Sequence, residues 1–155
     1  MEINNFQRIG SISNADVGRR FEVVAQEYFR QRENIELALN YPVGVSAPKA
    51  KEKKQRHFDL GSETPPVLVE CKSHRWTASG NVPSAKITVW SEAMYFFLLA
   101  PSQYRKVLFV LKDYSQKHKK TLAQYYVANY GHLIPDGVEI LEFDEDKNLA
   151  VRVTP

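Results

Sequence analysis

Cysteine occurs once in this chain of 155 residues, at Cys71. A single cysteine excludes a disulfide within the chain and is typical of proteins from a reducing compartment, so we expect a cytoplasmic location. The sequence also lacks a group of cysteines and histidines with the spacing of a zinc site, and it has no glycine-rich phosphate loop. It therefore gives no sign of a zinc domain or of a P-loop nucleotide-binding protein.

Long apolar runs and a strong excess of charge are missing too. No stretch approaches the roughly 18 apolar residues of a membrane-spanning helix, so we expect no association with a membrane. The segment MEINNFQRIGSISNADVG, residues 1–18, lacks the charged and apolar regions of a secretory signal, which agrees with that expectation. The formal net charge is only +3, which is compatible with an anionic partner but does not require one.

The composition that is present is that of an ordinary globular protein, with 43% hydrophobic and 25% charged residues. Without repeats, low-complexity segments or a linker, we predict a single domain over residues 1–155. Apolar periodicity and turn residues predict helices at 13–33, 81–100 and 119–131, and strands at 35–45, 56–62, from 67, 106–114, 138–144 and 149–154. This order predicts an α/β (α+β) fold, a central mixed β-sheet flanked by helices.

The first two predicted helices carry local signals. Ser13 followed by Asp16 resembles a capping box at the start of the first helix, and Glu22 lies next to the apolar stripe of that helix. In the second helix, the residues at helical spacing that we expect to face the core are Ile87, Trp90, Met94 and Phe97.

The segment VLVECK, residues 67–72, raises the question of function. A strand that begins with three apolar residues is suited to burial, yet it continues with Glu70 and Lys72, which are costly to bury without partners. Alternate side chains of a strand share a face, so Glu70 and Lys72 are expected on one side and the Cys71 side chain on the other. A Glu–Lys pair on a strand is most often a solvated ion pair of little energetic value, and that reading stays open beside a functional one.

An aspartate in the preceding strand adds to this pattern. If alternation puts Phe58 and Leu60 on one face, Asp59 lies on the other, and a hairpin would bring it beside Glu70. Asp59 and Glu70, with the backbone carbonyl of Cys71, then offer the oxygen ligands that Mg²⁺ prefers, and Mn²⁺ is the expected substitute. Lys72 would orient a metal-bound water or stabilise charge on a phosphate, and we favour the second role.

These residues resemble the core motif of the PD-(D/E)xK nucleases, the restriction-endonuclease-like superfamily. The match consists of Asp59 and then Glu70-Cys71-Lys72, in the segments FDLG and VLVECK, and Phe58 stands where the signature has proline. The helix segment GRRFEVVAQEYF is similar to the G-x-x-x-E helix of several branches, with Glu22 as the glutamate that assists the metal site. The resemblance covers residues 14–112. It implies a restriction-endonuclease-like three-layer core and a metal-dependent deoxyribonuclease.

Basic residues near this motif are candidates for binding the nucleic-acid backbone. The run PKAKEKKQR, residues 48–56, directly precedes the aspartate strand, and its alternative interpretation is a solvated hairpin loop. A polar segment, residues 73–86, leads from the motif into the next helix. The six side chains that we expect to contact phosphates are Lys51, Lys53, Lys54, Arg56, Arg75 and Lys86.

Four further residues are candidates for which a structural role is expected instead. We expect Trp76 to be a packing residue rather than a base-stacking one, and Glu92 to form a surface pair. A lone histidine more often satisfies a local hydrogen bond, which is the interpretation favoured for His57, while His118 is expected to be solvated.

Three functional hypotheses follow. The first is a Mg²⁺-dependent endonuclease that cleaves duplex or branched DNA, and the resemblance is compatible with a homodimer. The second is a catalytically inactive nucleic-acid-binding module of the same fold, whose salt-sensitive binding survives loss of Asp59 or Glu70. The third is an interaction protein with surface ion pairs and no affinity for DNA.

Overall fold

The computed structural model describes residues 14–154, so Ser13, predicted to cap the first helix, lies outside the described residues. Its elements follow the predicted order, with one additional short hairpin and a 3-10 turn. In chain order they are α1 (Asn14–Glu33), β1 (Ala38–Val45), β2 (Lys54–Glu63), β3 (Pro66–Lys72), α2 (Ser84–Leu99), β4 (Arg105–Leu111), β5 (Tyr114–Ser115), β6 (Lys120–Thr121), α3 (Leu122–Tyr130), the 3-10 turn (Gly131–Leu133), β7 (Val138–Asp144) and β8 (Leu149–Arg152).

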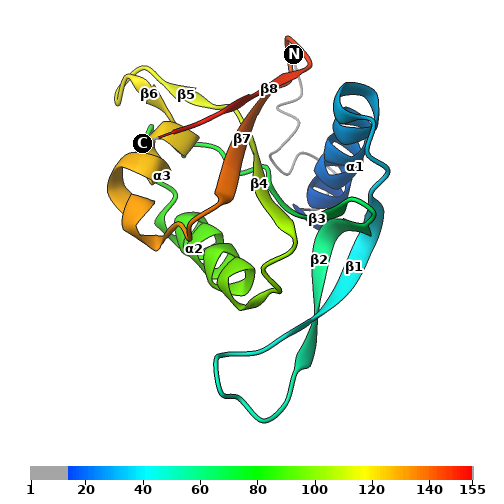
Figure 1. The fold of residues 1–155 in the computed structure, drawn as a ribbon. Helices are drawn as coiled ribbons and strands as arrows, with labels where there is room; N and C mark the ends of the chain where they lie inside the picture. The colour runs from blue at the N-terminus through cyan, green and yellow to red at the C-terminus, as the bar shows by residue number, and fades with distance from the viewer. Residues whose placement is uncertain (1–13, 155) are drawn as a thin grey trace.

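Six of the strands form one mixed sheet in the order β1-β2-β3-β4-β7-β8 (Figure 1). The pairs β1–β2, β2–β3 and β7–β8 are antiparallel, whereas β3, β4 and β7 run parallel to one another. Parallel neighbours need a crossover connection, which contains α2 between β3 and β4 and α3 between β4 and β7. The predicted mixed sheet and its closing hairpin are confirmed.

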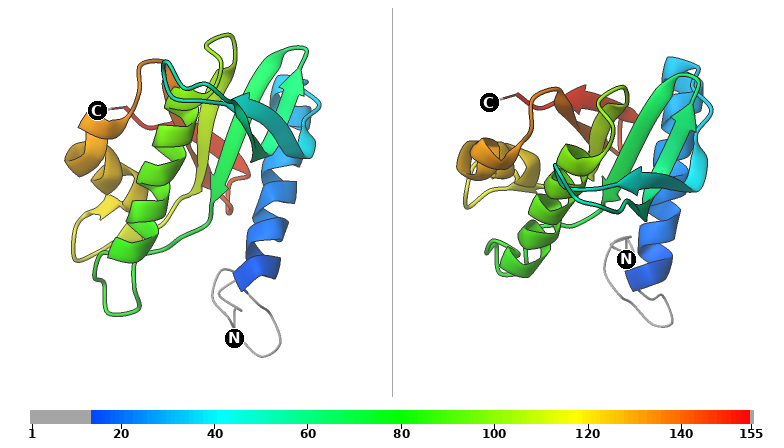
Figure 2. Two further views of the ribbon diagram at one scale, coloured as in Figure 1. Left: turned by 90° about the horizontal axis from the view of Figure 1, so that it is seen from below. Right: turned by 60° about the horizontal axis from the view of Figure 1, so that its bottom comes forward.

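Helices cover both faces of this sheet, as the views in Figures 1 and 2 show. One buried cluster joins α1 to the face that carries Leu60, Val69 and Phe109. The other joins α2 and α3 to the opposite face, which carries Leu68 and Leu108. The predicted arrangement of a central sheet between helices is therefore confirmed.

α1 packs on the sheet through a face that repeats every four residues, because residues four apart lie on one side of a helix. The centroids of the Phe21 and Phe29 rings lie 5.5 and 6.0 Å from that of Phe109 on β4. Glu22 follows Phe21 and lines a hollow beside β1 and β2. The buried face of α1 consists of Val17, Phe21, Ala25 and Phe29.

α2 begins at Ser84 after Pro83, which occupies the N-cap position, three residues later than the predicted start. The predicted core residues Ile87, Trp90, Met94 and Phe97 are all buried, so the helical spacing was interpreted correctly. The helix ends at Leu99, just before the Ala100–Pro101 step, and a residue that precedes proline disfavours the helical conformation.

β1 and β2 form a long hairpin that projects from the rest of the molecule (Figure 1). β2 begins at Lys54, so the predicted basic loop is shorter than expected and Lys54 belongs to the strand. The hairpin packs against the C-terminal half of α2: the rings of Phe58 and Phe97 stack at 5.8 Å, and the Arg56 guanidinium lies 4.1 Å from the ring centroid of Phe96.

The segment between β4 and α3 differs from the prediction. β4 ends at Leu111 and α3 begins at Leu122, because the hairpin β5–β6 occupies residues that were assigned to the ends of both elements. Thr121 caps α3: its hydroxyl accepts a hydrogen bond from the Gln124 backbone N–H, and the Gln124 side chain accepts one from Thr121 N–H. This capping box fixes the start of the helix. Beyond Tyr130 the chain continues as a 3-10 turn at Gly131.

None of the helices within residues 14–154 has both the length and the apolar character that a membrane span requires. α1, the longest helix described, has 20 residues and carries charge in its first and last turns, with Asp16 near its start and Arg30 and Arg32 near its end.

Candidate active site

The candidate site lies where β2 and β3 separate. The ladder between these strands reaches Leu60 and Val69, and the next residues in the same register are Asp59 and Glu70. β3 continues to Lys72 with β4 as its neighbour on the other side. The carboxyl end of β3 therefore has a paired strand on one side and an opening on the other, and Asp59 and Glu70 lie at this opening.

Asp59 turns its carboxylate toward the backbone of β3. The N–H of Cys71 donates a hydrogen bond to Oδ2 of Asp59 at 2.8 Å. A side-chain oxygen thus satisfies a donor of β3 where the ladder with β2 has ended. This bond holds the carboxylate of Asp59 beside Cys71.

The strict alternation predicted for β2 is wrong at this point. Phe58 belongs to the cluster under α2, whereas Leu60 belongs to the cluster under α1. On β1, Asn40 lies opposite Asp59, between the pairs Leu39–Leu60 and Tyr41–Phe58, and it adopts a left-handed conformation with φ 54°. Because the hairpin is irregular here, the period of two cannot assign Asp59 to a face.

Glu70 is buried, with 1% of its surface exposed, and lies between two cations. Its carboxylate is 3.4 Å from the Arg56 guanidinium and 3.6 Å from Nζ of Lys72. Burial and then the charge of Asp59 raise the pKa of Glu70 to about 7, although Lys72 and Arg56 oppose that shift. The solvated surface pair considered for Glu70 and Lys72 is therefore excluded.

α1 brings a third carboxylate to the site. Burial, the charge of Asp59 and a hydrogen bond with Asp59 raise the pKa of Glu22 to about 7, while Arg19 and Lys72 lower it. Two carboxylates held close together repel each other, which favours the protonated form of the more buried one. The raised pKa of Glu22 therefore reflects its partly buried position beside Asp59.

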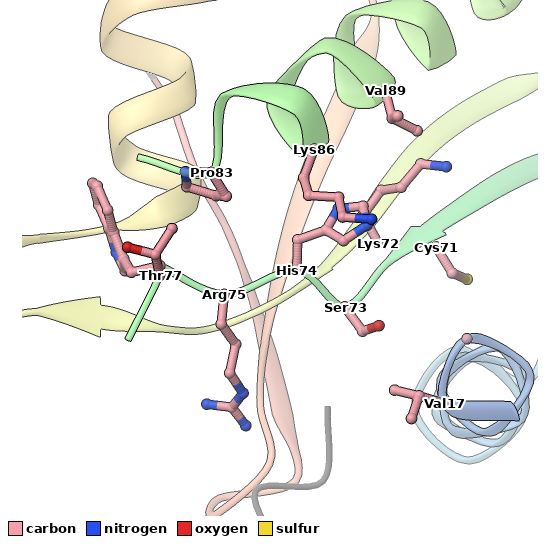
Figure 3. A pocket seen from close by; sticks show the side chains of 12 residues that line it. Val17, Cys71, Lys72, Ser73, His74, Arg75, Thr77, Pro83, Lys86 and Val89 are labelled. Carbon is pink, nitrogen blue, oxygen red and sulfur yellow. The ribbon is translucent and has the colours of Figure 1, made fainter. Parts of the chain in front are cut away.

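The thiol of Cys71 lies within the electrostatic influence of three carboxylates. Burial raises the pKa of its thiol, and so do the charges of Asp59, Glu70 and Glu22. The side chain points toward α1, away from Lys72, as Figure 3 shows. This orientation confirms the predicted one, and the disfavoured thiolate agrees with a packing role for Cys71 rather than a nucleophilic one.

The donors at this site fit Mg²⁺. Asp59 and Glu70 supply carboxylate oxygens and Cys71 a backbone carbonyl, and Mg²⁺ usually takes its remaining ligands from water and substrate phosphate. Within the part of the chain that the structure describes, no three His, Cys, Asp or Glu side chains form a metal-binding group by themselves. A cation placed among neighbouring carboxylates offsets their repulsion, and Mn²⁺ satisfies the same donors.

A pocket of about 370 Å³ opens beside the carboxyl end of β3. Its walls come from the start of α1, the start of α2 and the loop that follows β3 (Figure 3). Lys72, Arg75 and Lys86 line it, together with His74. The acidic group thus lies next to a pocket that carries positive charge.

His74 is the lining residue that the sequence interpretation missed. Trp90 Nε1 donates a hydrogen bond to its Nδ1 at 2.9 Å. Burial, followed by the charges of Lys72 and Lys86, lowers the pKa of His74 to about 4, so the imidazole is neutral at neutral pH. The available signal was its position, since Glu70, Lys72 and His74 occupy alternate places in the sequence.

The six basic residues predicted to contact phosphates fall into two groups. Arg56 is held against Glu70, and Arg75 bonds to Asp113 and to Glu145 at 3.2 and 2.7 Å. These ion pairs give both arginines a structural role in addition to any contact with a ligand. The remaining side chains are exposed on the β1–β2 hairpin and at the start of α2: Lys51, Lys53, Lys54 and Lys86.

The remaining candidates are distributed around this site. Trp76 is buried, which confirms its packing role, and it stacks on the ring of His118 at 4.4 Å. The prediction of a solvated His118 is wrong, because the β5–β6 hairpin brings its Nε2 to 2.9 Å from the carbonyl of Gly80. His57 is exposed, with Nδ1 3.4 Å from the Asn40 carbonyl oxygen, and Glu92 is exposed on α2.

Known proteins give no further guide to this arrangement. No protein-family model matches the chain, and neither a curated protein nor a solved structure matches it. The residues at the carboxyl end of β3 are therefore the basis for any functional assignment.

Proposed function

We propose that this chain is a Mg²⁺-dependent endonuclease with a restriction-endonuclease-like fold that hydrolyses DNA phosphodiester bonds. The observation that carries the proposal lies at the end of β3, where Asp59 accepts a hydrogen bond from the Cys71 N–H and the buried Glu70 pairs with Lys72. The element order α1-β1-β2-β3-α2-β4, with the motif residues on β2 and β3, supports it, because the resemblance to PD-(D/E)xK nucleases implies the same order.

Asp59, Glu70 and the carbonyl of Cys71 would hold the ion. A bound Mg²⁺ supplies a water of lowered pKa and neutralises charge on the phosphate. The Cys71 N–H orients Asp59, and Glu22 lies beside Asp59 on the side of α1. Glu22 is in this sense a positioning residue.

Lys72 supplies the positive charge on the substrate side. Only 14% of its side chain is exposed, and its ion pair with Glu70 fixes the position of Nζ. An ammonium group held in place stabilises the negative charge that develops on the phosphate during attack by water. Electrostatic stabilisation is therefore the role proposed for Lys72.

The substrate proposed is duplex or branched DNA. The exposed lysines of the β1–β2 hairpin and Lys86 would neutralise backbone phosphates without reading sequence. A homodimer, in which a second copy covers more of a duplex, is compatible with this proposal.

One observation favours a second candidate, a catalytically inactive nucleic-acid-binding module. Glu70 is buried and already neutralised by Arg56 and Lys72, an arrangement that also occurs in purely structural ion pairs. In such a module the basic pocket and hairpin would bind DNA without turnover.

Cleavage of plasmid and branched DNA with and without Mg²⁺ separates these candidates. We expect Asp59→Asn, Glu70→Gln and Lys72→Met each to lower the cleavage rate at least about 100-fold while DNA binding remains, because these groups act on the reacting phosphate. Asp136→Asn is the matched control, since Asp136 is exposed at the opposite end of the parallel strands, before β7.

The outcomes are distinct. Cleavage that persists in a chelator, or in Asp59→Asn, would overturn the proposed site. Binding without cleavage by the wild-type protein, under conditions in which Mg²⁺ is bound, would favour the inactive module. If wild type neither binds nor cleaves DNA, the remaining hypothesis is an interaction protein without affinity for DNA.

A further inference from the structure

The hydrogen bond from Trp90 fixes the tautomer of His74. An indole Nε1–H can only donate, and it lies 2.9 Å from Nδ1 of His74. Nδ1 must therefore present its lone pair, which leaves the ring proton on Nε2. Trp90 is fully buried in the core under α2, so it also holds the ring in one orientation.

The His74 ring belongs to a pocket with several donors. Lys86 extends from α2 on the same side of the loop as His74, and both line the pocket, whereas Ser73 and Cys71 point toward α1 (Figure 3). Lys72 leaves the end of β3 and lines the same pocket. None of the described residues that line this pocket is acidic. The ammonium group of Lys86, that of Lys72, which also pairs with Glu70, and one N–H donor suit an anion with several acceptor oxygens, such as a phosphate.

A neutral donor has a specific advantage at this position. Burial, followed by the charges of Lys72 and Lys86, disfavours protonation of His74, so the ring adds no further positive charge to the pocket. It can instead contribute a directed hydrogen bond to an oxygen that the cationic side chains of the pocket attract by charge.

We infer that His74 and Lys86 bind a DNA phosphate adjacent to the one that is cut, with His74 donating a hydrogen bond from Nε2 as a neutral group and Lys86 supplying charge. His74 follows the end of β3 and Lys86 lies at the start of α2, outside the pair of carboxylates that would hold the metal, so we assign them to a neighbouring phosphate. This inference rests on the proposed DNA ligand but does not require cleavage.

The test is DNA binding by the full chain at several salt concentrations, without divalent ions, using a short fluorescent duplex. We expect His74→Asn to weaken binding about tenfold, as for a hydrogen bond to a charged group, and to leave the salt dependence unchanged. Lys86→Ala should weaken binding and reduce the slope of log K against log salt by about 0.9, because one counterion fewer is released.

Two further variants make the test specific. His74→Gln places an amide N–H near the position of Nε2, so we expect it to retain most of the affinity that His74→Asn loses. His132→Asn is the matched control, because His132 is exposed on the 3-10 turn after α3. Thermal unfolding of each variant verifies that the comparison is made on folded protein.

The inference is overturned if the His74→Asn variant binds as tightly as wild type, or if its salt slope falls as much as that of Lys86→Ala. It is also overturned if wild type has no salt-sensitive affinity for DNA. A wild-type protein that binds DNA but does not cleave it would contradict the proposed nuclease and leave this phosphate site in place. Intact cleavage with unchanged binding by His74→Asn would contradict this site alone.

Discussion

At the level of single residues, the charge of Asp59 contributes to a raised pKa in both Glu22 and Glu70. Burial and the charge of Asp59 raise the pKa of each carboxyl to about 7. The folded state therefore holds protons that the unfolded chain releases between about pH 4.5 and pH 7. A group of this kind stabilises the fold below its unfolded pKa, and that contribution is lost as the pH rises through its folded pKa. The acidic site thus lowers stability at neutral pH, which is expected of a functional site.

Glu22→Gln tests this relation, because the amide imitates the protonated carboxyl group. We expect the variant to unfold a few degrees above wild type at about pH 8 and close to wild type at about pH 5, where folded wild type holds Glu22 protonated. Thermal unfolding followed by circular dichroism at the two pH values measures the difference. Glu36→Gln, at an exposed position after α1, should show no such dependence on pH. A Glu22→Gln effect of equal size at both pH values would contradict the assignment.

At the level of elements, regular segments were predictable and irregular ones were not. The core residues of α2 follow from helical spacing, because one buried face fixes the period. Alternation of side chains fails to predict the face of Asp59 on β2. Opposite this residue Asn40 has a positive φ, and the ladder with β3 ends at Leu60, so the period of two is interrupted. The β5–β6 hairpin was missed because strands of two residues carry no periodic signal.

The β1–β2 hairpin is the element for which a binding role is most directly testable. It projects from the body and carries exposed lysines at Lys51, Lys53 and Lys54. Replacing all three by alanine should lower DNA affinity and reduce the salt slope by up to about 2.7, since each phosphate that is no longer neutralised lowers the slope by about 0.9. Lys147→Ala, in the exposed turn between β7 and β8, serves as the control. If the triple variant keeps the DNA affinity and the salt slope of wild type, the lysines of the hairpin do not contact DNA and are simply exposed to solvent.

At the level of the whole molecule, the sheet gathers residues that the sequence separates. Glu70 and Lys72 were recognisable together because they are neighbours in one strand. Glu22 was assigned only through the resemblance, since its contact with Asp59 depends on how α1 crosses the sheet. His74 was missed because its orientation depends on a hydrogen bond from Trp90, which belongs to a different element. Local patterns therefore predicted the layers and the motif, but the partners of each side chain required the tertiary structure.

Binding of Mg²⁺ should stabilise the entire fold, because an ion bound only by the folded state adds to its free energy of unfolding. The gain is about 2.7 kcal/mol when the ion is present at about 100 times its dissociation constant. The ion competes with the protons on Glu22 and Glu70, so the increase in melting temperature on adding Mg²⁺ should be larger at about pH 8 than at about pH 6. Thermal unfolding with Mg²⁺ and with a chelator, at both pH values, measures this increase without any DNA.

Asp59→Asn provides the decisive comparison for that measurement. Asparagine keeps the size of Asp59 and removes its charge, so the variant should gain little from Mg²⁺ at either pH, whereas Asp136→Asn should gain as much as wild type. A wild-type protein that Mg²⁺ stabilises equally at both pH values would bind the ion away from the protonated carboxylates. A full increase in Asp59→Asn would place the ion elsewhere on the chain, and the convergence of acids at the end of β3 would then serve only the packing of α1 against the sheet.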